Sequence, residues 1–321
     1  MNILQAQDLT KNYGDFRAVD RITFSINQGE IFGLLGPNGA GKTTTINMLT
    51  GLAMITSGTA TLGGFDCNRD LRKAQQLMGI VPDESNLYEE MDGFQNLCFC
   101  GALYGMPKAK REKRAAELLV EFGLADAGKK KFNAYSRGMK RRLTIAAGII
   151  HEPSILFLDE PTTGIDVASA RQIRRLIQDL NHKGTTIFLT THYIEEAERL
   201  CHRIAFMVGG KIVRIGTLRE LMMDAQKENI VQFRAVGSLE KIGEAISREF
   251  PSVRTEFYGR DLVRIHSQQP LNLAPLVRVF DQNNISVYEA KIIRPSLEEV
   301  FVKVTGIEIA KMKQEKEKVK K

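Results

Sequence analysis

Nine residues, Gly36 to Thr44, have the types and spacing needed to bind a nucleotide phosphate. They fit the pattern G-x-x-x-x-G-K-[ST]. Glycines allow backbone turns that are closed to other residues, so that N–H groups reach phosphate oxygens. Lys42 supplies a compact positive charge for the β- and γ-phosphates, and Thr43 offers a hydroxyl to Mg²⁺. We therefore expect a nucleotide phosphate site formed by Gly36, Pro37, Asn38, Gly39, Ala40, Gly41, Lys42, Thr43 and Thr44.

Two acidic residues follow a second apolar stretch, Ile155 to Leu158. A carboxylate at the end of a buried strand is costly unless a cation pairs with it, so Asp159 is expected to hold Mg²⁺. Glu160 points away from Asp159 and is the candidate general base for an attacking water. His192 closes a third apolar stretch, at a strand end where the sites of α/β sheets lie, which favours a functional role.

The pattern of apolar residues predicts the elements that position these side chains. Residues 30–35 read as a buried strand that enters the glycine-rich loop, and Thr43 to Thr50 as a helix that ends at Gly51. The positive end of that helix points at the phosphates. Residues 1–222 as a whole predict an α/β P-loop core, with an antiparallel β-subdomain and a helical insertion at about residues 88–150.

The pattern changes towards the end of the chain. The polar stretch Leu221 to Asn229 is interpreted as a hinge, and residues 230–306 then follow the order βαββαβ. That order predicts a small, ferredoxin-like α+β domain. Residues 307–321 form a basic tail, in which six Lys and three Glu between Glu308 and Lys321 predict a solvated, frayed helix.

Composition restricts the class of protein. A length of 321 residues allows two domains, and 43% hydrophobic with 26% charged residues is typical of a globular protein. No apolar run reaches the 18 or so residues of a membrane span, and the first residues do not resemble a signal peptide, so we expect a cytoplasmic protein. Four scattered cysteines predict neither a disulfide framework nor a zinc site. A net charge of +7 permits nucleic acid or an anionic membrane as a neighbour without requiring either.

Tyr135-Ser-Arg-Gly-Met139 lies ahead of the second acidic strand. With the glycine-rich loop and the acidic pair, it makes residues 4–218 resemble the ATP-binding-cassette (ABC) ATPases. The family signature is Leu-Ser-Gly-Gly-Gln, and this chain keeps Ser136 and Gly138, the groups that would meet a γ-phosphate. In that family the signature faces the P-loop of the opposite subunit. The resemblance therefore implies ATP and Mg²⁺ as cofactors and a head-to-tail dimer, here expected to be a homodimer.

Other roles are implied only by this resemblance. Tyr13 matches the aromatic residue that stacks on adenine, although from the residues alone it reads as a strand aromatic. His192 matches the histidine that senses the γ-phosphate, and residues 164–166 match a loop that contacts the opposing subunit. Asp83 stands where the family has a glutamine. Its carboxylate can approach Mg²⁺ or a water but cannot donate a hydrogen bond, so its contact with the site is left open.

The segment Pro295 to Gly306 resembles the closing segment of drug- and antibiotic-exporter ATPases. These have a small C-terminal domain for assembly or regulation and work with a separate membrane permease. The implied function is an ATP-hydrolysing exporter subunit, peripheral on the inner face of the membrane. One alternative is a soluble ABC ATPase acting on nucleic acid or ribosomes, which the lack of a tandem cassette or long heptad insertion in this sequence disfavours. The other is a regulatory module whose C-terminal domain binds a ligand or partner.

Overall fold

The apolar stretch before the glycine-rich loop forms the centre of a six-stranded sheet. The computed structural model describes residues 1–225, 229–237, 239–259, 261–293 and 296–307. Neighbouring strands of the sheet are parallel, except for an antiparallel pair at one edge. The strands in the middle are fully buried, as expected for parallel strands that are covered on both faces. In spatial order they are β10 (Lys211–Thr217), β9 (Arg203–Val208), β3 (Ile31–Leu35), β8 (Thr186–Thr191), β7 (Ile155–Asp159) and β6 (Met78–Val81).

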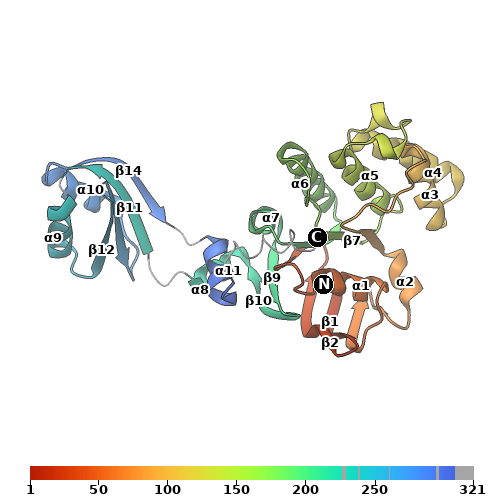
Figure 1. Ribbon diagram of the computed structural model, residues 1–321, viewed down its shortest axis with the longest axis horizontal. Helices are drawn as coiled ribbons and strands as arrows, with labels where there is room; N and C mark the ends of the chain where they lie inside the picture. The colour runs from red at the N-terminus through yellow and green to blue at the C-terminus, as the bar shows by residue number, and fades with distance from the viewer. Residues whose placement is uncertain (226–228, 238, 260, 294–295, 308–321) are drawn as a thin grey trace. The chain divides into compact units, whose positions relative to one another are not determined.

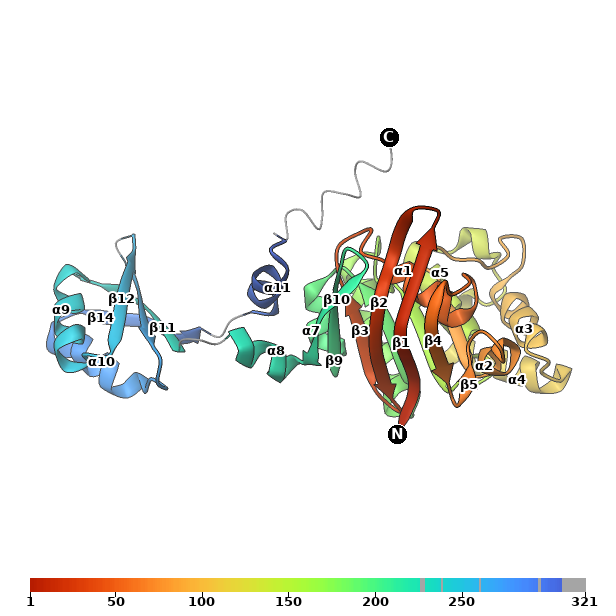
Figure 2. The ribbon, with the colours of Figure 1, turned by 90° about the horizontal axis from the view of Figure 1, so that it is seen from below.

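A second, antiparallel sheet packs on the first through aromatic side chains. Its strands in spatial order are β2 (Phe16–Asn27), β1 (Asn2–Tyr13), β4 (Ser57–Leu62) and β5 (Phe65–Asp66), and Figure 2 shows the long ones side by side. The ring of Phe24 stacks on Phe32 of β3 at 5.5 Å between centroids, and Phe32 stacks on Phe188 of β8 at 5.9 Å. These rings belong to the apolar core that joins the two sheets.

Helices surround the parallel sheet, and several begin with a side-chain cap. Ser136 and Asp166 each accept a hydrogen bond from a backbone N–H in the first turn of their helix. Helices α3, α4 and α5 pack on one another and form the predicted helical insertion (Figure 1). The helices of this part of the chain are α1 (Lys42–Thr50), α2 (Leu71–Gln76), α3 (Gly93–Leu103), α4 (Lys108–Glu121), α5 (Arg137–Ile149), α6 (Val167–His182) and α7 (Ile194–Leu200), with 3₁₀ turns at Ala125–Ala127 and Phe132–Ala134.

The later part of the chain forms a separate compact unit, Arg219–Lys303, and the first unit contains Met1–Leu218. Its elements follow the predicted order: β11 (Asn229–Val236), α9 (Leu239–Glu249), β12 (Val253–Tyr258), β13 (Leu262–Ser267), α10 (Leu273–Gln282) and β14 (Ser286–Ile293). The sheet order is β12-β13-β11-β14, all antiparallel, as in a ferredoxin-like domain. Both helices pack on one face of it (Figure 1), with the Phe233 and Phe280 rings 4.8 Å apart. Helix α11 (Leu297–Thr305) follows.

One local prediction is wrong. The stretch interpreted as a hinge, Leu221 to Asn229, begins inside helix α8 (Leu218–Ala225) and ends at the first residue of β11. Leu221 is fully buried, so the stretch carries an apolar anchor that its polar average conceals. Residues 226–228 of the predicted hinge and 308–321 of the predicted basic tail lie outside the described residues.

Among the described helices, none has the length and apolar character required to span a bilayer.

The aromatic core between the two sheets leads to a stability prediction. Replacing Phe188 with Ala removes a fully buried ring and should lower the free energy of unfolding of the first unit by about 3–5 kcal/mol. Urea unfolding of the nucleotide-free protein measures this value. The matched control is Phe16→Ala, because Phe16 is 66% exposed and its loss should cost less than about 0.5 kcal/mol. Equal losses in the two variants would contradict the packing described.

Candidate active site

The glycine-rich loop connects β3 to α1 and packs tightly against its neighbours. A Cβ atom on Gly36 would lie 2.1 Å from the carbonyl oxygen of Met207 in β9. A Cβ on Gly41 would lie 2.6 Å from the carbonyl oxygen of Ala18 in β2, and Gly41 has a φ of 104°. Both positions therefore require glycine for steric reasons, which explains two of the fixed places in the motif.

Lys42 is buried and turns back into the loop that precedes it. Its Nζ donates hydrogen bonds to the carbonyl oxygens of Gly36 (2.9 Å) and Pro37 (3.1 Å). It also forms an ion pair with Glu160 Oε1 at 3.1 Å, and both side chains are less than a tenth exposed. Lys42, the predicted phosphate ligand, is thus neutralised by Glu160, the predicted general base.

Glu160 lies immediately beyond β7 in a left-handed backbone conformation, with a φ of 48°. This conformation is uncommon for a residue other than glycine and directs the side chain away from that of Asp159. Glu160 Oε2 lies 2.7 Å from His192 Nδ1 and accepts a hydrogen bond from Thr163 Oγ1 at 3.0 Å. Glu160 therefore contacts both Lys42 and His192, and the sequence singles out all three residues.

The pKa of Glu160 reflects two opposing influences. Burial raises it, but the hydrogen bond from His192 and the positive charge of Lys42 outweigh burial and lower the pKa from 4.5 to about 2. Glu160 is therefore ionised at neutral pH. While Lys42 remains its partner, Glu160 is a weak base, because a base with so low a pKa has little tendency to take a proton from water.

Asp159 is the last residue of β7 and is 4% exposed. Its Oδ1 accepts a hydrogen bond from the Thr190 hydroxyl. A buried carboxylate together with the Thr43 hydroxyl gives the hard oxygen ligands that suit Mg²⁺, which keeps several waters. The described residues contain no cluster of three or more His, Cys, Asp or Glu side chains able to hold a metal. The two oxygen donors, Asp159 and Thr43, fit a Mg²⁺ ion that would also bind water and phosphate.

A pocket of about 310 Å³ opens beside the loop. Tyr13 and Phe16, which pair across the β1–β2 turn, line it and are 51% and 66% exposed. Two such rings at the mouth of a phosphate site form a platform on which a nucleotide base could stack. Asp83, whose contact with the site the sequence left open, also lines the pocket. The remaining lining comes from Ala18, Glu160 and the seven residues from Asn38 to Thr44. All of these except Ala18 are predicted site residues.

Ser136 and Gly138, both in the described part of the chain, lie outside this pocket. Ser136 is exposed at the N terminus of α5, where its Oγ accepts a hydrogen bond from Met139 N at 3.3 Å. Gly138 is buried because α6 packs closely there, and an added Cβ would lie 2.7 Å from Ser169 Cβ. Tyr135 stands where the family signature has leucine, and its hydroxyl donates a hydrogen bond to the Ala127 carbonyl at 2.7 Å. The signature thus forms a well-anchored helix start that the chain's own P-loop pocket does not include.

Sequence reasoning missed several residues of the site. Phe16 could have been recognised as the partner of Tyr13 across a short turn. Thr163 and Thr190 contact the acidic pair, but a threonine near an acidic strand gives no distinctive sequence signal. Arg141 on α5 donates to backbone carbonyls on both sides of Glu160, and only the folded chain brings them together.

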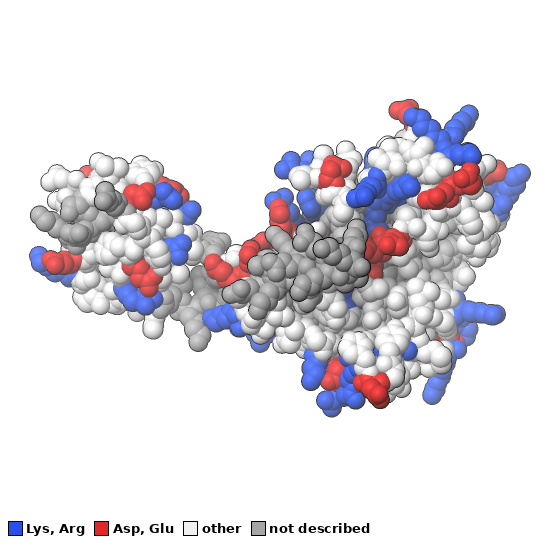
Figure 3. All heavy atoms as spheres, in the orientation of Figure 1, with Lys and Arg blue, Asp and Glu red and all other residues white. Residues whose placement is uncertain are grey.

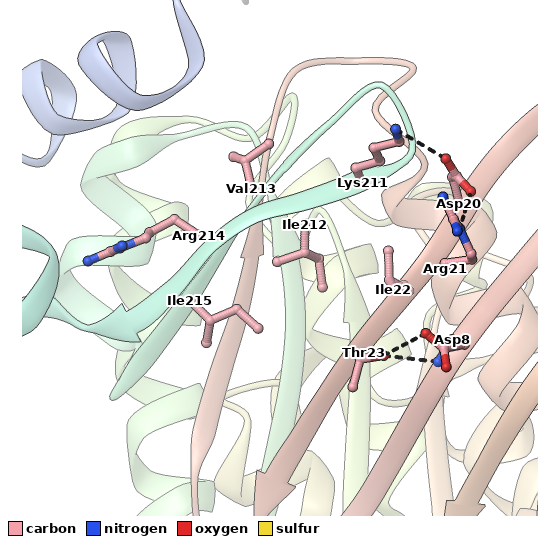
Figure 4. Close-up of a pocket in the computed structure, with 10 residues that line it drawn as sticks. All are labelled: Asp8, Asp20, Arg21, Ile22, Thr23, Lys211, Ile212, Val213, Arg214 and Ile215. Carbon is pink, nitrogen blue, oxygen red and sulfur yellow. Dashed lines mark hydrogen bonds and ion pairs between the residues drawn. The ribbon is translucent and has the colours of Figure 1, made fainter.

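A larger cavity of about 690 Å³ lies between β2 and β10 (Figure 4). It shares no lining residue with the P-loop pocket. Several of its polar groups pair with one another: Asp20 contacts Arg21 and Lys211, and Asp8 contacts Thr23. We therefore place the candidate active site at the P-loop pocket, where predicted catalytic groups converge, although that pocket is the smaller one.

Comparison with known proteins identifies the family. Residues 19–163 match the family model described as ABC transporter. The chain is 38% identical over 309 residues to the linearmycin resistance ATP-binding protein LnrL of Bacillus subtilis, covering 95% of this chain and 98% of that protein. The chain belongs to the ABC transporter ATP-binding proteins. This ABC protein is also 36% identical over 302 residues to the doxorubicin resistance ATP-binding protein DrrA of Mycobacterium tuberculosis, covering 92% and 91% of the two chains.

Solved structures agree with this assignment. An ATP-binding subunit of an ABC transporter matches with a TM-score of 0.64 and 29% identity, covering 70% of this chain and 93% of that one. A dimeric ATP-binding cassette, solved with ADP and Pi after hydrolysis, matches with a TM-score of 0.62 and 27% identity, covering 67% and 99%. The predicted fold class, family and ATPase activity of this ABC protein are thus confirmed, and ATP with Mg²⁺ is its cofactor.

The low pKa of Glu160 predicts how stability changes with pH. Because the folded-state pKa lies below the usual value, ionised Glu160 stabilises the fold above about pH 4.5, and this contribution is lost as the pH falls towards 2. One pKa unit corresponds to about 1.4 kcal/mol, so the lost contribution amounts to roughly 3 kcal/mol. As the pH falls from about 4.5 to about 2, the free energy of unfolding measured with urea should decrease more steeply for the wild type than for Glu160→Gln. Parallel stability curves would contradict the buried ion pair.

Proposed function

We propose that this chain uses its P-loop pocket as half of an ATP site and that a second copy of the chain completes the other half. The observation that supports this most directly is the separation within one chain of Lys42, Glu160 and His192 from Ser136. The first three are buried together at adjacent strand ends, whereas Ser136 is exposed at the start of α5, outside the pocket. In a head-to-tail homodimer, each exposed helix start would face the P-loop of its partner.

Each residue of the half-site has a proposed role. Lys42 and backbone N–H groups from Gly36 to Thr44 would bind the phosphates, while Thr43 and Asp159 would hold Mg²⁺, with Asp83 near it. Tyr13 would stack on the adenine. Phosphate oxygens at Lys42 would replace Glu160 Oε1 as its partner, which would raise the pKa of Glu160 and make the carboxylate a better base. His192, already 2.7 Å from Glu160, would orient it and contact the γ-phosphate. Substrate binding would thereby activate the general base.

The work done by this ATPase is proposed to be export through a separate membrane permease. The relatives named for linearmycin and doxorubicin resistance cover nearly the whole chain, including its C-terminal domain. We place the protein on the inner face of the membrane, where the loop from Asp83 and the helices α3 to α5 would transmit dimer closure to the permease. The C-terminal domain would serve assembly or regulation. The permease, and not this chain, would select the cargo.

The alternative of a soluble ATPase that acts on nucleic acid receives no support. The relatives reported above are named for drug resistance. On the face drawn in Figure 3, the described Lys and Arg side chains lie among Asp and Glu and do not gather into one basic stripe. A protein that tracks a phosphate backbone usually presents such a stripe.

Glu160→Gln tests the base assignment. The amide keeps the size of the side chain but cannot accept a proton, so phosphate release should fall by about 10²–10⁴-fold while ATP still binds. The variant should accumulate as a dimer in ATP, measured by size-exclusion chromatography. Glu195→Gln is a matched control, because Glu195 is 69% exposed on the neighbouring helix and should keep normal turnover. Wild-type turnover by Glu160→Gln would overturn the assignment.

Mixing two inactive variants tests the shared site. Ser136→Asp keeps an oxygen that can cap α5 but places a negative charge where the γ-phosphate would sit, and Lys42→Ala disables the P-loop. Each variant alone should be inactive. A one-to-one mixture should recover about a quarter of the wild-type rate, because half of the dimers then contain one intact site of two. No recovery, with both variants folded, would show that sites are not shared between copies of this chain.

A further inference from the structure

Arg141 is a buried arginine whose guanidinium contacts backbone carbonyls from two different strand ends. It lies on α5 and is 5% exposed. Its Nε donates to the carbonyl oxygen of Pro161 at 3.0 Å and its Nη2 donates to that of Asp159. Its Nη1 donates to the carbonyl oxygens of Pro82 and Asp83, the latter at 3.2 Å. The rigid, planar guanidinium presents several N–H groups at fixed angles, which allows one side chain to bridge four carbonyls.

Two of these carbonyls flank Glu160 directly. The bonds to Asp159 and Pro161 hold the backbone on either side of a residue whose φ of 48° is uncommon for glutamate. From this turn the side chain of Glu160 reaches both Lys42 and His192. Arg141 therefore fixes the base through its backbone, without touching the carboxylate.

The other two carbonyls begin the segment that contains Asp83. The same stretch of α5 holds this segment further along: Thr144 Oγ1 lies 2.8 Å from Ser85 Oγ, and Lys140 forms an ion pair with Glu89 at 3.9 Å. Arg141 is the one of these α5 residues that also reaches the acidic strand. It thus joins the Asp83 segment, the Glu160 turn and the helix that begins at Ser136.

We propose that Arg141 is a positioning residue that sets Glu160 for hydrolysis and couples it to the Asp83 segment and the signature helix. This inference rests on the proposed role of Glu160 as the general base. A strict consequence follows: Arg141 should affect the chemical step far more than nucleotide binding, because the P-loop contacts of Lys42 do not involve it.

Arg141→Met keeps an unbranched side chain that can remain buried and removes the guanidinium with all its donors. We expect ATP affinity within about threefold of the wild type and a kcat lower by about 10- to 100-fold, as a displaced catalytic group produces. The matched control is Arg142→Met. Arg142 is the next residue of α5 and also donates to two carbonyls, of Phe122 (2.9 Å) and Gly123 (3.3 Å), at the far side from the acidic strand. The Arg142→Met variant should therefore have the kcat of the wild type.

A double substitution separates positioning from general damage. If Arg141 acts through Glu160, then Arg141→Met should slow single-turnover hydrolysis by less than about twofold in a Glu160→Gln background. The full 10- to 100-fold loss in that background would overturn the proposal. Wild-type turnover by Glu160→Gln alone would instead contradict the base assignment, so the two failures are distinguishable.

Arg141→Lys covers the case in which the methionine variant does not fold. Lysine keeps the charge but has one compact nitrogen, which cannot bridge carbonyls at two strand ends. We expect a kcat at least about fivefold lower with unchanged ATP affinity, whereas Arg142→Lys should match the wild type. A wild-type kcat for Arg141→Lys would overturn the proposal.

Discussion

The buried ion pair between Lys42 and Glu160 is the constraint on which the site depends. It joins the loop after β3 to the turn after β7, and His192 at the end of the intervening β8 completes the contact. Removing one member would leave the other charged in a buried place, which is strongly unfavourable. The parallel sheet brings these strand ends together, so the order β3-β8-β7 is as necessary to the chemistry as the residues themselves.

The same site also depends on how its backbone is held. Glu160 occupies an uncommon conformation, and its amide donates to the Thr190 carbonyl at 3.1 Å while Arg141 holds the carbonyls beside it. The side chain is thus placed by ion pairing, and the backbone by charge-assisted hydrogen bonds from a buried cation to neutral carbonyls. Burial lowers the pKa of Arg141, but the nearby carboxylates of Asp83 and Asp159 oppose this. An arginine can occupy such a position because its pKa starts so high that it remains protonated.

Much of the candidate site could be predicted from the sequence because its signals are local. The P-loop and the acidic strand each depend on residues within a few positions of one another. The role of Arg141 could not be predicted, since its partners lie 18 to 59 positions away along the chain. Helix α8 was missed for a different reason: averaging over a polar stretch hid the buried Leu221.

The close approach of α5 and α6 has a consequence for the surface that would face a second subunit. At Gly138 the helices leave no room for a methyl group, and the nearest atoms belong to Ser169, with Ile165 at 3.9 Å. Ser169 also donates its backbone N–H to Asp166, which caps α6. The signature and the loop that precedes α6 are therefore parts of one stiff body. If α5 moves, α6 should move with it. The signature and the loop before α6 would then contact a second subunit as one continuous surface.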